Sequence, residues 1–183
     1  MQPSSTSASG FTLTELLTTL AIAGLLAALG MPALGSLVSR VTDTRAATAI
    51  TGSLHQARAA AVVRGTRVLL CPSRDRVHCR AGDDWQHGWI IGIDTDADGQ
   101  PDAGAPLIAA QAALHAGTRV ITSRGRGQIV FHPNGSAAGS NARFTICRLH
   151  TRMATAVVVA NSGRVRLAGA RPDQLQACLT GGQ

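Results

Sequence analysis

Two arginines near the C-terminal end of the chain are spaced to hold phosphate groups. They lie in the run Gly163-Arg164-Val165-Arg166, which follows a cluster of turn-forming residues. On a strand, Arg164 and Arg166 point to one face, about 6–7 Å apart. Each guanidinium can bind a phosphate in a bidentate manner, and a glycine lets the turn approach a ligand closely. The simpler interpretation is a solvated hairpin with ordinary surface arginines.

A run of acidic residues has the spacing of a cation-binding loop. Asp94, Asp96 and Asp98, followed by Gly99, match the first positions of an EF-hand calcium loop. Position twelve lacks the expected glutamate, because Ala105 is there, and no helix pattern flanks the run. We therefore interpret it as an acidic turn between strands, with a calcium site as the alternative. The sequence predicts no cofactor.

No arrangement of residues suited to catalysis stands out in the sequence. His132 and Ser136 lie in a turn signature that has no GxSxG motif and no partner acid. The six histidines are scattered, and no pair of cysteines has the CxxC spacing of a zinc site. We therefore predict a protein that is not an enzyme.

The charge balance indicates an anionic partner. All 17 basic residues are arginine, and the chain has a net charge of +7 and a pI near 11. Glu15 is the only glutamate and lies in an apolar segment, so the remainder of the chain has a net charge of +8. Such an excess suits nucleic acid or an anionic surface.

The N-terminal segment combines an apolar helix pattern with one carboxylate. Residues Phe11 to Leu29 nearly span a bilayer core, where the charge of Glu15 would cost about 2.5–3.5 kcal/mol. Gly10, Phe11, Glu15 and Pro32 together resemble a type IV prepilin. The resemblance implies cleavage between Gly10 and Phe11 by a prepilin peptidase, methylation of the new Phe11 amine, and pairing of Glu15 with a neighbouring amine in the filament. The alternative is an ordinary membrane anchor.

The prepilin resemblance implies a cleaved leader at residues 1–10, and the residue pattern predicts a helix at 11–65 that spans the membrane to about residue 32 and a β domain at 66–183. Arg64-Gly65 is typical of a helix C-terminus. Seven β-type runs follow, at Arg67–Cys71, Gly88–Ile93, Arg119–Ser123, Gln128–His132, Arg143–Arg148, Thr155–Asn161 and Arg164–Ala168. The expected fold is α+β, a long N-terminal helix packed on a C-terminal antiparallel β-sheet domain.

Several segments of the β domain resemble the GspH/FimT family of minor pilins and pseudopilins. They are Val68-Leu69-Leu70-Cys71-Pro72-Ser73, Trp85, Gly88-Trp89-Ile90, Asp94 and Gly163-Arg164-Val165-Arg166. GspH-like members are minor pseudopilins of type II secretion. FimT-like members are minor type IV pilins, and some resemble DNA receptors for natural transformation in which the GRxR arginines contact DNA.

The resemblance and the positive charge together predict a FimT-like minor type IV pilin. It would bind extracellular double-stranded DNA without sequence preference, for uptake in natural transformation, and take part in pilus assembly. Arg164, Arg166 and Gly163 would form the site, which Arg148, Arg152 and Arg171 are candidates to widen. The alternative is a structural, GspH-like pseudopilin of type II secretion that does not bind DNA.

The same resemblance implies the partners and the location. Besides DNA, the expected partners are other major and minor pilins, the prepilin peptidase and the inner membrane. The protein would be a single-pass protein of the inner membrane of a Gram-negative bacterium, with its β domain in the periplasm, until it joins the extracellular pilus.

The four cysteines predict two disulfides, because a domain outside the cytoplasm lies in an oxidising compartment. We expect Cys71–Cys79 to close a short loop and Cys147–Cys178 to tie the C-terminal tail to a strand, each contributing about 2–4 kcal/mol. The four aromatic residues of the β domain are expected to fill its core. They are Trp85, Trp89, Phe131 and Phe144. Phosphate contacts, rather than base stacking, would then dominate DNA binding.

Overall fold

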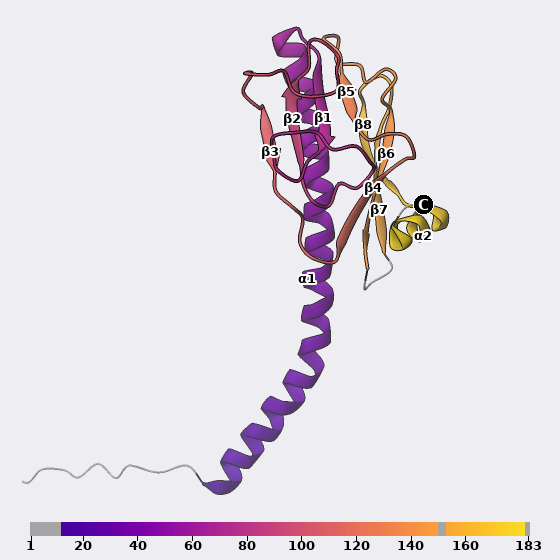
Figure 1. Ribbon diagram of the computed structural model, residues 1–183. Coiled ribbons are helices and arrows are strands. Elements are labelled where there is room, and N and C mark those ends of the chain that lie inside the picture. The colour runs from indigo at the N-terminus through magenta and orange to yellow at the C-terminus, as the bar shows by residue number, and fades with distance from the viewer. Residues whose placement is uncertain (1–11, 150–152, 182–183) are drawn as a thin grey trace, which may run out of the picture. The chain divides into compact units, whose positions relative to one another are not determined.

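A long helix precedes two antiparallel sheets and a short C-terminal helix (Figure 1). The computed structural model describes residues 12–149 and 153–181. The elements are α1 (Leu13–Arg64), β1 (Val68–Pro72), β2 (Trp89–Ile93), β3 (Ala109–Gln111), β4 (Thr118–Thr122), β5 (Ile129–Phe131), β6 (Ala142–Arg148), β7 (Ala154–Val159), β8 (Val165–Gly169) and α2 (Pro172–Thr180). The chain divides between Val41 and Thr42 into two compact units, which are described separately.

The ends of α1 follow from local capping interactions. Thr12 precedes the helix, and its Oγ1 accepts a hydrogen bond from the backbone N–H of Glu15 at 3.3 Å, as an N-cap residue does. Glu15 lies in the first turn, where the helix dipole favours a carboxylate. At the other end, Gly65 has a φ of +62°, and the N–H of Thr66 donates to the carbonyl of Ala61. This Schellman-type ending stops α1 at Arg64, as the sequence predicts.

The first part of α1 is apolar and exposed in the unit to which it belongs. Large apolar side chains accessible to solvent here are Leu13, Leu16, Leu17, Leu20, Ile22, Leu25 and Leu26. In the part of the chain that the structure describes, no helix has the combination of length and hydropathy needed to cross a membrane.

The β domain contains two four-stranded antiparallel sheets. The first has the strand order β3-β2-β1-β5 and the second β4-β6-β7-β8. All seven predicted strands are present, each beginning and ending within two residues of its expected bounds. The sequence did not predict β3 or α2, nor the division of the strands between two sheets.

One core joins α1 to both sheets. The buried face of the helix carries Ile50, Leu54, Ala57 and Ala61, all fully buried and spaced three or four residues apart. Side chains from both sheets contribute to the same cluster. The alanines let the helix come close to the strands, and Trp89 Nε1 donates a hydrogen bond to Ser53 Oγ of the helix at 2.8 Å. The predicted packing of the helix on the β domain is confirmed.

The four aromatic residues of the β domain fill this core, as predicted. Each of Trp85, Trp89, Phe131 and Phe144 has at most 1% of its surface exposed. Trp85 meets Phe144 edge to face, with ring centroids 4.9 Å apart. Trp85 lies in the segment that precedes β2.

Both predicted disulfides are present. Cys71–Cys79 closes the loop after β1, and Cys147–Cys178 joins β6 to α2. A small apolar cluster that includes Ile121 and both cysteines of the second disulfide lies beneath α2. The helix thus covers part of the outer face of the second sheet.

Replacing Leu54 by alanine should lower the free energy of unfolding by about 2–5 kcal/mol, because it leaves a cavity between α1 and the sheets. Val63→Ala is the matched control, since Val63 is 85% exposed on the same helix and should change little. Chemical unfolding of the full chain in detergent measures both variants. A Leu54→Ala protein as stable as the Val63→Ala control would contradict the packing described.

Candidate nucleic-acid interface

The β7–β8 hairpin presents Arg164 and Arg166 to solvent. The turn is closed by hydrogen bonds from the Gly163 N–H to the Ala160 carbonyl, 2.8 Å, and from the Ala160 N–H to the Arg164 carbonyl, 3.0 Å. Val165 packs against the main core, whereas Arg164 and Arg166 are exposed. Because side chains alternate along a strand, the two arginines share the outer face.

Gly163 serves the packing of this turn. It is buried and has a φ of +75°, which favours glycine. A Cβ at this position would overlap the carbonyl oxygen of Gly135. The same oxygen accepts a hydrogen bond from Arg58 Nε of α1 at 3.0 Å. The sequence suggests that Gly163 lets the turn approach a ligand closely. In the structure the group that lies against Gly163 is the Gly135 carbonyl, so Gly163 fixes the position of the hairpin that carries the arginines.

The sheet register adds Arg143 to the same surface. Arg143 of β6 pairs with Val158 of β7, and Val158 pairs with Arg166 of β8. Phe144, the neighbour of Arg143, points into the core, so Arg143 points outward. Strands are about 4.8 Å apart, which puts the backbones at Arg143 and Arg166 about 10 Å apart across the sheet. Arg143 is far from Arg166 in the sequence, so the sequence alone did not predict that the two share a surface.

A depression of about 370 Å³ continues this surface toward α2. Arg124, Arg143 and Arg171 line it, together with Asp83 and Asp173. Arg171 donates from Nε and Nη2 to the carboxylate of Asp173, both at 3.1 Å. These hydrogen bonds hold the pKa of Asp173 below its usual value, so Asp173 stays ionised and offsets the charge of Arg171.

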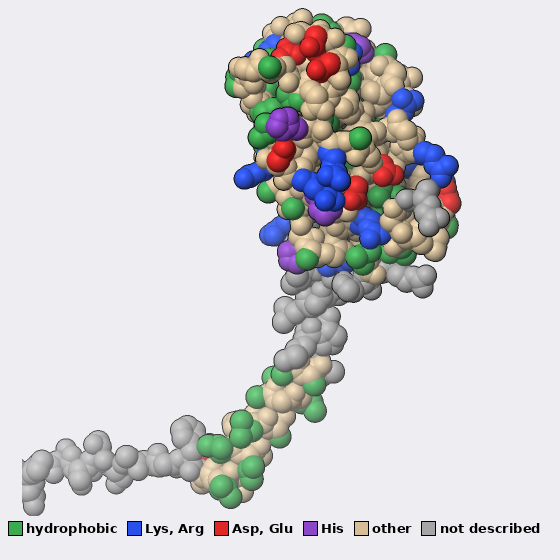
Figure 2. All heavy atoms as spheres, in the orientation of Figure 1, with side chains coloured by type: hydrophobic (Ala, Val, Ile, Leu, Met, Phe, Trp, Pro, Cys, Tyr) green, Lys and Arg blue, Asp and Glu red, His purple; other side chains and the backbone are tan. Residues whose placement is uncertain are grey.

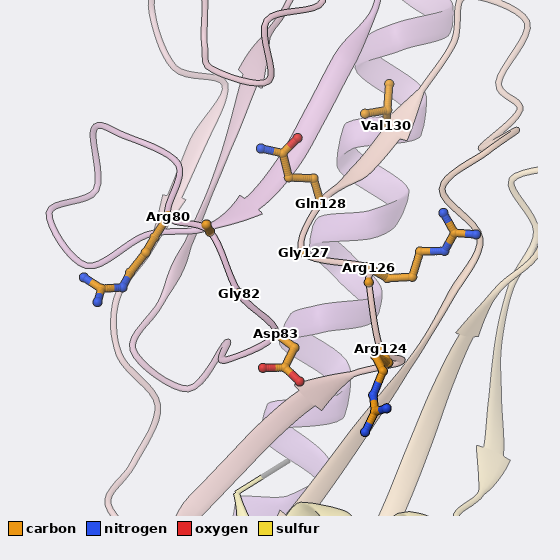
Figure 3. A pocket seen from close by; sticks show the side chains of 10 residues that line it. Arg80, Gly82, Asp83, Arg124, Arg126, Gly127, Gln128 and Val130 are labelled. Carbon is orange, nitrogen blue, oxygen red and sulfur yellow. The ribbon is translucent and has the colours of Figure 1, made fainter. Parts of the chain in front are cut away.

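A second depression, of about 540 Å³, lies beside the first and shares Asp83 and Arg124 with it. Figure 3 shows that the side chains of Arg80 and Arg126 point away from each other. Arg126 Nη1 also donates to the Gly139 carbonyl at 2.6 Å. The arginines therefore do not converge on one anion, and they extend the basic surface rather than form a closed pocket. Figure 2 shows arginine side chains gathered with a few acidic ones on this domain.

Arg148, another predicted site residue, is not brought to this surface. Arg148 is at the opposite end of β6, five residues or about 17 Å along the strand from Arg143. Glu15 lies in the other unit of the chain. Gly10, Phe11 and Arg152 lie outside the described residues.

The acidic loop after β2 brings together Asp94, Asp96 and Asp102, whose nearest carboxylate oxygens are all within 4.8 Å of one another. Asp98, the third predicted candidate, is not part of this group.

A long N-terminal helix packed on an antiparallel β domain is the architecture of pilins and pseudopilins. The sequence model of the family described as Type II transport protein GspH matches residues 46–163, well over half of the chain. The match ends just before Arg164. No curated protein sequence matches the chain.

Solved structures of minor pilins and pseudopilins share the fold. The type IV minor pilin FimU of Pseudomonas aeruginosa is 21% identical with a TM-score of 0.59, over 72% of this chain and 92% of FimU. The minor pseudopilin EpsH of the Type 2 Secretion System of Vibrio cholerae is 14% identical with a TM-score of 0.52, over 70% of this chain and 97% of EpsH. The family model that matches residues 46–163 shows that the chain belongs to the GspH/FimT family of minor pilins and pseudopilins.

Gly163→Ala should lower the stability of the domain by more than about 1 kcal/mol, because the new Cβ meets the Gly135 carbonyl at a positive φ. Gly169→Ala is the control in the same hairpin, since nothing lies within 4 Å of an added Cβ there. Thermal unfolding compares the two variants. Equal melting temperatures would show that the turn does not need its glycine.

Proposed function

We propose that this minor pilin binds double-stranded DNA through its phosphate backbone, for uptake in natural transformation. The observation that carries the proposal is the shared outward face of Arg143, Arg164 and Arg166. None of the three forms an ion pair with any residue that the structure describes. Their charges are therefore available to phosphates, to which arginine donates in a bidentate manner.

The composition of the surface favours phosphate contacts over base contacts. All aromatic side chains among the described residues are buried, so they provide no platform on which exposed bases could stack. The net charge of +7 supports attraction to a polyanion. Binding of this kind has little sequence preference and weakens steeply as salt rises.

The same proposal includes assembly into a type IV pilus. Cleavage between Gly10 and Phe11 by a prepilin peptidase would free an amine for methylation, and Glu15 would pair with such an amine on a neighbouring pilin. Before assembly the protein would be anchored in the inner membrane with its β domain in the periplasm. The fold shared with FimU, a type IV minor pilin, supports this assignment.

Replacing Arg164 and Arg166 together by glutamine should weaken binding to a short duplex and lower the slope of log affinity against log salt by about 2, one for each lost phosphate contact. Fluorescence anisotropy over a series of salt concentrations measures the slope. The control is the double variant Arg64→Gln plus Arg74→Gln, which removes the same charge from exposed positions elsewhere. Equal loss in both double variants would show that only net charge matters, and an unchanged slope would remove the two arginines from the site.

Arg143→Gln should weaken DNA binding more than Arg148→Gln, because only Arg143 shares the outward row with Arg166. The expected change in salt slope is about 1 for Arg143 and near zero for Arg148. The same anisotropy assay compares them, with melting temperatures to show that both variants are folded. A larger effect of Arg148 would place the interface at the other end of β6.

A second candidate function is a structural role in a type II secretion pseudopilus without DNA binding. The match to the family described as Type II transport protein GspH favours it. A strain that lacks the protein distinguishes the two roles when DNA uptake, pilus formation and protein secretion are measured in parallel. Lost uptake with normal secretion supports the DNA-binding pilin, whereas lost secretion with normal uptake supports the pseudopilin.

A further inference from the structure

The loop after β2 concentrates negative charge in a domain that is otherwise basic. Residues 94–102 contain four of the nine aspartates of the chain. The loop begins where β2 ends, opposite the first residue of β1, at the end of the domain where α1 also ends (Figure 1). Figure 2 shows acidic side chains gathered at this end of the domain.

Three carboxylates of this loop come together. One oxygen from each of Asp94, Asp96 and Asp102 lies within 4.8 Å of the other two. Asp94 is fully buried, Asp102 is half-buried and Asp96 is exposed. Asp102 is held in place by Thr95, which donates from its backbone N–H and its hydroxyl to the two carboxylate oxygens at 2.8 and 2.7 Å.

Asp94 has a buried oxygen that lacks a partner within the described part of the chain. Its Oδ2 accepts a hydrogen bond from Arg67 Nε at 3.1 Å, whereas Oδ1 is shielded from solvent and receives no hydrogen bond from any residue that the structure describes. A buried carboxylate oxygen without a partner is unfavourable, and a water molecule or a cation can supply the missing partner. The two oxygens share one carbon, so the unpartnered oxygen borders the cluster of carboxylates.

Three of the four aspartates of the loop have no ion-pair partner among the residues described. Arg67 pairs with Asp94, but Asp96, Asp98 and Asp102 form no ion pair with any residue in the described ranges. Carboxylate oxygens this close repel one another unless a cation lies between them. A divalent cation would relieve the repulsion and give Asp94 Oδ1 its missing partner.

We propose that Asp94, Asp96 and Asp102 bind a calcium ion. Calcium takes six to eight oxygen ligands and tolerates irregular geometry, so backbone carbonyls and water can complete the shell. Magnesium needs a tighter octahedral site. Ala105 stands where an EF-hand has its bidentate glutamate, so the expected Kd is weak, about 10⁻⁴–10⁻³ M, as in extracellular modules.

The loop also joins other segments, so bound calcium should stabilise the domain. The side chain of Gln100 accepts from the Cys79 N–H at 2.8 Å and donates to the Cys79 carbonyl at 3.2 Å. Gln128 Nε2 donates to the Gly99 carbonyl at 2.7 Å. A calcium ion that holds this loop in place therefore also restrains the disulfide loop after β1 and the segment that precedes β5.

Calorimetric titration of the full chain in detergent micelles, after removal of metal with chelator, tests the site with CaCl₂ and with MgCl₂. We expect saturable calcium binding, a higher melting temperature in calcium than in chelator, and weaker binding of magnesium. Asp96→Asn should weaken calcium binding by about tenfold or more. The control Asp84→Asn, also exposed but outside the loop, should bind as the unchanged protein does.

Any one of three results would overturn the proposal. The first is no calcium binding up to about 10 mM, well above the expected Kd. The second is equal binding of magnesium and calcium, which indicates diffuse attraction, and the third is unchanged calcium binding by Asp96→Asn. Circular dichroism shows whether the Asp96→Asn protein is folded. No DNA is present, so the outcome is separate from that of the DNA-binding proposal.

Discussion

The burial of one face of α1 against both sheets is the constraint on which the structure depends. Ile50 and Leu54 fill the space between the sheets, while Ala57 and Ala61 let the helix lie close to the strands. The inner face of each sheet is therefore buried in the core. The outer face of the second sheet is left for α2, the second disulfide and the arginines.

The alternation of side chains along the strands of the second sheet determines which arginines lie on the same face. Phe144 and Val165 must face the core, so the adjacent residues Arg143 and Arg166 face outward. Antiparallel pairing through Val158 places these two in one row. The outward-facing surface that carries these arginines thus follows from packing, since the core requires apolar residues at the alternate positions. An arginine is not part of that surface merely because it is near in sequence, as the position of Arg148 shows.

Local patterns predicted most of the fold. The seven strands, the end of α1 at Arg64 and both disulfides could be predicted because each depends on periodicity, capping residues or compartment. β3, with the sequence Ala-Ala-Gln, has no β pattern of its own and forms by pairing with β2. α2 is short, and it depends on the second disulfide and on Arg119, which donates to two carbonyls at its C-terminal end. Sheet order, and with it the position of Arg143 beside Arg166, has no signal in a single sequence.

NMR of the isotope-labelled chain in detergent, titrated with a short DNA duplex, tests most directly whether the outer face of the second sheet is the interface. The account predicts that signals of Arg143, Arg164 and Arg166 shift together in proportion to bound DNA, while those of Arg74 and Arg148 stay in place. Shifts spread evenly over all exposed arginines, or confined to a different face of the domain, would contradict it.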